Sequence, residues 1–176
     1  MQISFLVPNI GAPSLGFATA YARVLAERHP VQVVGPDLWG GGVMPMYRGC
    51  LDYTVVPTPR LYRFPDYFWE SERLCRVATG DVLFAVKAMP QTVGVALREK
   101  RRLGCKVVVC LDEWDGALMA RRSPAERRAY WRRHWMHPLE DNYCPWVERL
   151  FPRADLVVST STFLQRRFGG EVVRMG

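Results

Sequence analysis

The sequence predicts an α/β protein, with a single Rossmann-like, doubly wound and mainly parallel sheet that carries helices on both faces. Two observations predict this fold. Short apolar runs alternate along the chain with segments of helical periodicity, and the runs are apolar nearly throughout, as strands buried on both faces are. The 176 residues are also fewer than the roughly 250 that a closed barrel of eight strand–helix units needs, which favours an open sheet.

The apolar runs give the expected strands, and the periodic segments between them give the expected helices. Strands are expected at 3–7, 31–35, 53–57, 81–86, 106–111 and 155–159, and over the final EVVRM. Helices are expected at 15–28, 66–78, 91–102, from Ser123 onward, at about 139–150, and over STFLQRRF. No repeat or linker divides the chain, so residues 1–176 are expected to form one domain.

Two helix starts carry capping signals. Ser14 is the expected N-cap of the first helix. Ser123 and Glu126 have the spacing of a capping box, and Pro124 stands at the first helical position.

Composition limits the classes of partner. The net charge is +7, and of the 24 basic residues only Lys87, Lys100 and Lys106 are lysines. Such a balance favours anionic partners, which include phosphates, nucleic acid and an anionic membrane surface. No run reaches the length of a membrane span and no signal-peptide pattern opens the chain, so a cytoplasmic protein is expected, with peripheral attachment to the inner membrane face as an option.

The five cysteines indicate free thiols. Cys105 and Cys110 lie in a strand pattern and no C-x-x-C pair occurs, which favours buried thiols over disulfides or a metal site. His134 and His137 lie near Cys144, but Pro138 stands between the histidines and no cysteine pair has ligand spacing. No metal and no cofactor is therefore expected.

Three segments are expected at the edge of the sheet where ligands bind. In open parallel sheets this edge lies beyond the carboxyl ends of the strands, near the point where the strand order reverses. The segments are 8–14, Lys87–Gln91 and Asp112–Asp115. The first loop, PNIGAPSLG, precedes a helix N-terminus, which favours a phosphate, with a plain turn as the alternative. It lacks the glycines of G-x-G-x-x-G, so NAD is disfavoured, and a P-loop occurs nowhere.

The stretch VVVCLDEWDG carries the candidate catalytic residues. Asp112 directly follows an apolar strand, where an unpaired carboxylate is costly. Trp114 offers a flat apolar wall of the kind that backs a sugar or an acyl chain. We therefore expect Asp112 or Asp115 to line a cleft. The alternative is that Asp115 only caps a short helix and Glu113 is solvated.

The segment RRSPAERRAYWRRHWMHP is the candidate anionic-surface element. Arginines are mixed with aromatic residues in it. The residues expected to contact an anionic surface are Arg127, Arg128, Trp131, Arg132, Arg133 and Trp135. This pattern suits contact with an anionic membrane surface, stacking on nucleic acid, or a merely solvated helix. No recognised nucleic-acid motif accompanies it, so nucleic acid is not expected as a partner.

Three passages, in order, resemble the N-terminal half of a GT-B glycosyltransferase of glycosyltransferase family 4, the retaining group 1 enzymes. GFATAYARVLAERHPVQVVGP resembles the first helix and second strand of that family. GDVLFAVKAMPQTVGVALREKRRLGCKVVVCLDEWD resembles the family pattern of a lysine, a P-x-T helix start and a strand that ends in polar residues. RADLVVSTSTFLQRRFGGEVVRMG resembles the passage that closes the N-terminal domain.

The resemblance implies the acceptor-binding half of an enzyme that moves a sugar from a nucleotide-diphosphate sugar to a hydroxyl acceptor. The basic segment rich in arginine and tryptophan adds the expectation that this acceptor is lipid-linked or anionic. The nucleotide sugar would bind mainly to a C-terminal domain that this chain lacks, so the chain is expected to be inactive alone. Residues expected to approach the donor diphosphate or the acceptor are Asn9, Gly11, Ser14, Gly16, Lys87 and Trp114, beside Asp112 and Asp115. The alternative is a non-enzymatic Rossmann-like module that binds a phosphorylated ligand or a protein partner.

Overall fold

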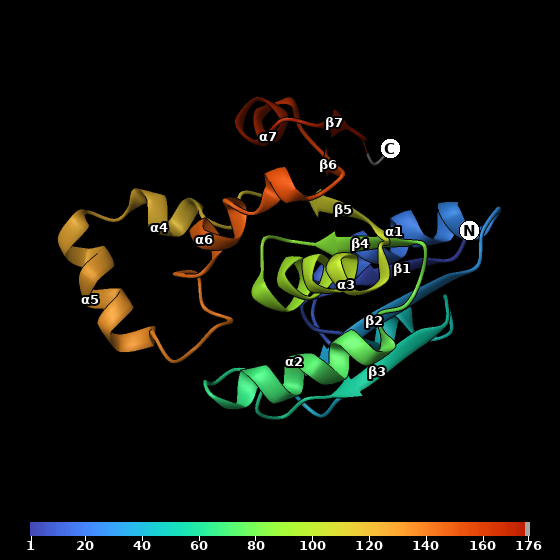
Figure 1. Cartoon of the computed structure of the whole chain (residues 1–176), viewed down its shortest axis with the longest axis horizontal. Coiled ribbons are helices and arrows are strands. Elements are labelled where there is room, and N and C mark those ends of the chain that lie inside the picture. Colours follow the sequence, from blue (N-terminus) through green and yellow to red (C-terminus); the bar gives the residue numbers. More distant parts are fainter. Residues whose placement is uncertain (175–176) are drawn as a thin grey trace.

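The protein is described here from a computed structural model, which describes residues 1–174. Seven parallel strands form one sheet in the order β3-β2-β1-β4-β5-β6-β7 (Figure 1). The strands are β1 (Ile3–Leu6), β2 (Val31–Asp37), β3 (Tyr53–Pro57), β4 (Val82–Val86), β5 (Lys106–Leu111), β6 (Leu156–Ser159) and β7 (Glu171–Val172). The order runs outward from β1 in both directions and therefore reverses between β1 and β4, which confirms the doubly wound, Rossmann-like sheet.

Helices connect the strands. They are α1 (Ser14–Ala26), α2 (Asp66–Val77), α3 (Val95–Leu103), α4 (Ala117–Arg121), α5 (Pro124–His134), α6 (Cys144–Glu148) and α7 (Thr162–Phe168). Short helical turns add η1 (Pro45–Tyr47), η2 (Pro90–Gly94) and η3 (Phe151–Arg153).

The two faces of the sheet bury separate cores. On one face, side chains such as Leu83 and Val109 pack under α2 and α3. On the other, Phe5 and Val33 pack under α1 and the 43–53 loop. Alternate residues of each strand pack into the two cores. A strand that is buried on both faces is therefore apolar at nearly every position, which explains the continuous apolar runs.

The first helix begins one residue earlier than its capping signal predicts. Ser14 is the first residue of α1 and makes no side-chain cap, so the prediction that it is the N-cap is wrong. The amide of Ala12 already donates to the Asn9 carbonyl, at 3.2 Å, and the amide of Leu15 donates to the Ala12 carbonyl, at 3.0 Å. The chain is therefore helically coiled before it reaches Ser14.

Three other boundaries differ from the prediction. The helix expected at about 139–150 is only α6, because Pro145 lacks an N–H and is tolerated near a helix start, not inside it. Strand β2 continues through Gly35 and Pro36 to Asp37. Strand β7 has only two residues, and Met175, at the end of the predicted strand EVVRM, lies outside the described residues.

Residues 117–148, from α4 to α6, form an arm inserted between β5 and β6. In Figure 1 the arm, coloured gold to orange, stands to the left of the sheet. A backbone hydrogen bond from the Phe64 amide to the Met136 carbonyl, at 2.8 Å, joins it to the segment before α2, and within the arm the Tyr130 hydroxyl donates to Glu140, at 2.7 Å. Helix α5 itself buries no residue.

Two further predictions concern the cysteines and membrane crossing. Cys105 and Cys110 are buried, as their strand pattern predicts. Within residues 1–174, no helix combines the length and the apolar character that a bilayer crossing requires.

Candidate active site at the carboxyl edge of the sheet

The candidate site lies where the strand order reverses. The loops that leave β1, β4 and β5 all emerge at the carboxyl edge of the sheet, because the three strands are parallel neighbours. The register joins Val86 of β4 to Cys110 of β5, so the residues that follow these two strands face one another. The three predicted segments are therefore brought to one edge.

Lys87, the first residue after β4, is the centre of this edge. Its φ of +68° lies in the left-handed region, which costs free energy for any residue with a Cβ. Two hydrogen bonds hold it there: its amide donates to the Cys110 carbonyl, at 2.9 Å, and its carbonyl accepts from the Thr92 hydroxyl, at 3.0 Å. The turn directs the side chain toward the loop after β5.

Three carboxylates surround the Lys87 ammonium. Its Nζ lies 3.4 Å from Asp112 and 3.6 Å from Asp115, and it also donates a hydrogen bond to Glu113. Asp115 is the most buried of the three, with a side chain 5% exposed, and it accepts from the Ala88 amide at 2.7 Å. Asp115 therefore joins the loop after β5 to the loop after β4 and is not a helix cap; the N-cap of α4 is Gly116.

This cluster contains one positive charge and three carboxylates. Burial lowers the pKa of Lys87, but attraction to Asp115, the hydrogen bond with Glu113 and attraction to Asp112 together raise it above its ordinary value. Burial also raises the pKa of Asp115, although the Ala88 amide and Lys87 both act to lower it. Both directions hold because one ammonium is shared among three carboxylates and cannot fully compensate the one most shielded from water.

Asp112 is the carboxylate best placed to meet a ligand. Its side chain is 29% exposed, so solvent reaches it, while Asp115 beneath is closed off. The Asp112 Oδ1 is buried and lies 3.4 Å from the Lys87 ammonium, with no hydrogen-bond partner among the described residues, so the exposed surface of the group belongs to its other atoms. Glu113, expected to be solvated, is 65% exposed but still contacts Lys87.

The first loop is more enclosed than its sequence suggests. The Asn9 side chain is buried, and its Oδ1 accepts from the Gly11 amide at 3.1 Å. A Cβ on Gly16 would lie 2.2 Å from the Tyr47 hydroxyl oxygen, so this glycine is required for packing against η1. The Gly16 amide, a candidate phosphate donor, already donates to the Pro13 carbonyl at 3.0 Å.

Gln91 is a buried residue of the Lys87–Gln91 segment for which no role was predicted. Its side-chain amide donates to the Pro8 carbonyl, at 3.4 Å, and so links the loops after β1 and β4. Its Oε1 and the Asn9 Nδ2 are buried without a partner among the described residues. The sequence could have indicated Gln91. It is a polar residue in the loop that follows an apolar strand, and it stands directly after Pro90, where a helix begins.

Trp114 does not present an open wall. Its ring packs against the core under α2 and α3, and the guanidinium carbon of Arg167 lies 3.4 Å from the ring centroid. One face of the indole is thus taken by a cation from α7. The expected backing for a sugar would need Arg167 to move.

The arginine and tryptophan residues of the arm divide into two sets. Arg127, Arg128, Trp131 and Arg132 line a groove between α5 and α6, whereas Arg133 lies on another side of α5, near Arg122 and Glu126. Trp135 is 53% exposed, and its carbonyl accepts from the Tyr143 hydroxyl. In residues 1–174 no group of three or more histidine, cysteine, aspartate or glutamate side chains is placed to hold a metal ion.

The fold is that of one Rossmann-like half of GT-B glycosyltransferases. All of the chain aligns with 44% of Anabaena HepE (Alr3699), solved with UDP and glucose, at a TM-score of 0.64 and 14% identity. It likewise aligns in full with 52% of apo UGT2 from Phytolacca americana (TM-score 0.56, 12% identity). For Arabidopsis thaliana UGT89C1 in complex with UDP, 99% of this chain aligns with 48% of that one (TM-score 0.52, 10% identity).

The chain thus spans about half the length of these solved structures, 44–52%. No protein-family model matches the sequence, and no curated protein is similar to it in sequence.

Proposed function

We propose that this chain is the N-terminal, acceptor-binding half of a retaining glycosyltransferase of glycosyltransferase family 4, which moves a sugar from a nucleotide-diphosphate sugar to an acceptor hydroxyl. The observation that carries the proposal is that the whole chain has the fold of one half of GT-B glycosyltransferases. UDP is bound in the HepE and UGT89C1 structures, so a UDP-sugar is the donor to test first.

In this proposal the carboxyl edge of the sheet is the acceptor side of the reaction cleft. Asp112 is a partly exposed carboxylate there; its buried Oδ1 faces Lys87, so the exposed part of the group would accept the hydrogen bond from the acceptor hydroxyl. Lys87 and Asp115 hold the two loops that carry it, through the ion pair and the Ala88 amide. Asp112 is thus the candidate catalytic residue, and Asp115 and Lys87 are positioning residues.

The donor would meet this half only at the first loop. Gly11 and Ser14 are partly exposed there, whereas the Gly16 amide is already bonded within the loop. The donor is therefore expected to bind mainly to a second domain, and residues 1–176 alone should show weak donor binding and no transfer. Robust transfer by this polypeptide by itself would contradict the proposal.

The proposal is tested on the product of the complete reading frame that contains this sequence. Release of UDP from UDP-glucose and other UDP-sugars is measured with Asp112→Asn and with Glu27→Gln, an exposed carboxylate at the end of α1 that loses the same charge. Asp112→Asn should lower kcat/KM by roughly 10- to 100-fold, because it weakens a hydrogen bond that orients the acceptor. Glu27→Gln should change nothing.

Two results would count against the proposal. Full activity of Asp112→Asn would remove this residue from the site. Absence of turnover with every nucleotide sugar tried, together with tight binding of a phosphorylated ligand or a protein, would favour the alternative, a non-enzymatic module.

A further inference from the structure

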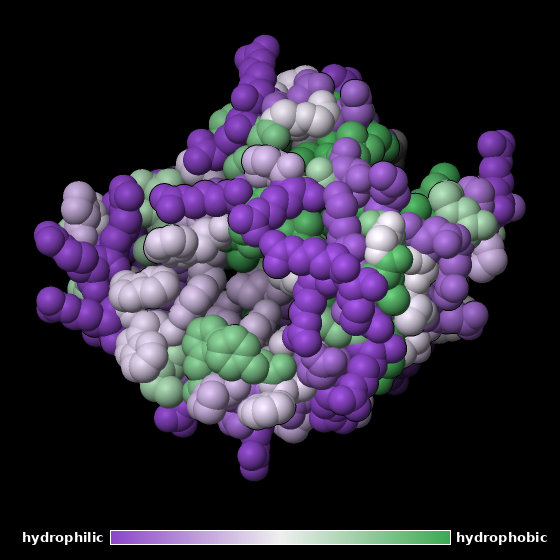
Figure 2. All heavy atoms as spheres, viewed as in Figure 1, coloured by the Kyte–Doolittle hydropathy of each residue, from purple (hydrophilic) through white to green (hydrophobic). Residues whose placement is uncertain are grey.

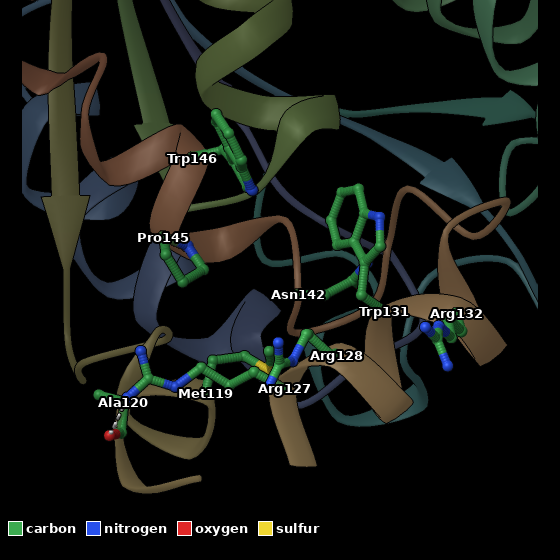
Figure 3. Close-up of a pocket in the computed structure, with 9 residues that line it drawn as sticks. All are labelled: Met119, Ala120, Arg127, Arg128, Trp131, Arg132, Asn142, Pro145 and Trp146. Carbon is green, nitrogen blue, oxygen red and sulfur yellow. Dashed lines mark hydrogen bonds between the residues drawn. The ribbon is translucent and has the colours of Figure 1, made fainter. Parts of the chain in front are cut away.

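The arm carries a groove that the proposed cleft does not include. It has a volume of about 440 Å³, within the range of small-molecule sites, and lies between α4, α5 and α6. In Figure 2 side chains of intermediate hydropathy lie over the arm, at the left of the view, with strongly hydrophilic side chains at its outer edge. In Figure 3, Pro145 and Trp146 lie along one side, Met119, Arg127 and Arg128 along the other, and Trp131 and Asn142 at one end.

The groove has an aromatic wall made by two helices. Trp131 of α5 and Trp146 of α6 face one another, with ring centroids 6.4 Å apart. The two side chains are 38% and 56% exposed. Two neighbouring large apolar side chains that are this exposed form an apolar patch on the surface. An apolar body lying against the pair would cover surface that is now in contact with water.

The second feature of the groove is uncompensated positive charge. Arg128 and Arg132 make no ion pair or hydrogen bond with any residue of the described part of the chain, 1–174. Arg127 is held in place: its guanidinium donates to the Arg122 carbonyl, at 2.8 Å, and to the Ala120 carbonyl, at 3.4 Å. Three guanidinium groups on one helix face form a site suited to phosphate, which accepts several hydrogen bonds at once.

The third feature is an unsatisfied amide. Asn142 lines the groove and is 2% exposed, yet neither its Oδ1 nor its Nδ2 has a hydrogen-bond partner in the described residues. Burying both polar atoms of an amide without partners is costly, and a native structure rarely does so without a use for the group. A ligand with hydroxyl or phosphate oxygens would supply the missing bonds.

We propose that this groove binds a phosphate ester with an apolar body. The phosphate lies on Arg128 and Arg132, the apolar body lies against the exposed surface of Trp131 and Trp146, and an ester or hydroxyl oxygen lies near Asn142. The groove is thus an amphipathic-anion site, distinct from Lys87 and its carboxylates. The identification of this ligand as the sugar acceptor rests on the proposed function, whereas the binding itself does not.

The test is calorimetric titration of the purified chain with octyl phosphate below its micellar concentration. Octyl phosphate should bind as one molecule per chain. Arg128→Gln and Arg132→Gln should each weaken the affinity by roughly tenfold, the scale of a lost charge-assisted hydrogen bond. Arg133→Gln is the matched control, since it removes the same charge from the same helix but lies outside the groove, and it should change the affinity by less than about twofold.

Two further measurements separate the parts of the ligand. Inorganic phosphate and octyl glucoside each lack one half of it and should bind far more weakly than octyl phosphate. Asn142→Leu should weaken octyl phosphate binding without lowering the melting temperature, because it removes an amide that has no partner in the free protein. Unchanged octyl phosphate binding by Asn142→Leu would show that Asn142 takes no part in the site.

The source of the phosphate is decided by flotation with phosphatidylcholine vesicles that contain phosphatidic acid. Flotation lost in Arg128→Gln and kept in Arg133→Gln identifies a lipid headgroup as the ligand, and octyl phosphate binding without flotation identifies a soluble phosphate ester.

The proposal is overturned if octyl phosphate does not bind. Equal weakening by Arg128→Gln and Arg133→Gln would also overturn it, because it would show diffuse electrostatic attraction without a groove. These readouts need no donor sugar, so a failure of the transfer assay leaves them interpretable.

Discussion

At the scale of single residues, the carboxyl edge is organised by Lys87. A lysine in the left-handed region with an ammonium among three carboxylates is strained in its backbone and costly in its desolvation. The fold tolerates both because the Lys87 amide is hydrogen-bonded to Cys110 of β5 and because, in residues 1–174, Asp115 has no other cation close by. The side chain therefore supports the loops that carry Asp112.

Replacement of Lys87 by methionine should leave Asp115 buried without its cation. We expect Lys87→Met to lower the free energy of unfolding by about 3 kcal/mol at neutral pH, and Lys87→Met with Asp115→Asn to recover at least about half of that loss. Lys106→Met is the control, because that lysine is 70% exposed and pairs with Asp155 at the surface, where the loss should stay below about 1 kcal/mol. Urea unfolding measures all four proteins.

The same variant makes a prediction about pH. Burial raises the pKa of Asp115, and loss of Lys87 raises it further, so the folded variant retains a proton that the unfolded chain releases. A carboxyl group with a raised folded pKa favours the folded state below its unfolded pKa and loses that contribution as the pH rises. The deficit of Lys87→Met should therefore shrink as the pH falls from about 7 to about 4. A deficit independent of pH would contradict the burial of a charged Asp115.

The sequence predicted which residues reach this edge but not how they pair. Asp112 and Asp115 were found because carboxylates follow an apolar strand. Their shared contact with Lys87 depends on the β4–β5 register, which no local pattern contains. For the same reason the Arg167 side chain over Trp114 could not be anticipated, since it comes from α7, beyond the arm and one further strand, β6.

At the scale of elements, helix α5 is an unusual case. It has no buried residue, so packing contributes little to its stability and the terminal signals must contribute more. The capping box that the sequence predicts is present: the Ser123 hydroxyl accepts from the Glu126 amide, at 3.3 Å, and the Glu126 carboxylate accepts from the Ser123 amide, at 2.7 Å. The capping box could be predicted because it is a local pattern. The prediction failed at Ser14 because the chain already turns before this residue, through the hydrogen bond from the Ala12 amide to the Asn9 carbonyl.

Removal of this cap should unwind the start of α5 selectively. Ser123→Ala should destabilise the helix by about 1 kcal/mol, seen as faster hydrogen exchange at the amides of residues 126–130 with little change in global unfolding. Ser14→Ala is the matched control, since Ser14 begins α1 but makes no cap. Faster exchange in α1 after Ser14→Ala, or none in α5 after Ser123→Ala, would show that caps do not decide these helix starts.

At the scale of the whole molecule, the two faces of the sheet are unequally covered. Helices α2 and α3 cover one face from β2 to β5, whereas, within residues 1–174, α1 is the only α-helix packed into the core of the opposite face. Beyond α1 lies an apolar hollow of about 590 Å³ lined by side chains of α1, β4, β5 and β6. Its rim includes Val24 and Leu156, which are 67% and 39% exposed. Parallel sheets are otherwise buried on both faces, so this surface is the least satisfied part of the fold.

The uncovered face should make the isolated chain self-associate. Val24→Gln with Leu156→Thr should lower the average mass measured by light scattering at high protein concentration, because less apolar surface is then removed from water on association. The melting temperature should not fall, since neither side chain is fully buried. Leu118→Gln is the control: this leucine is 54% exposed but lies on α4, away from the hollow, and its replacement should leave the average mass unchanged. If Leu118→Gln were equally effective, association would reflect total exposed apolar area, and the uncovered sheet face would have no special part in it.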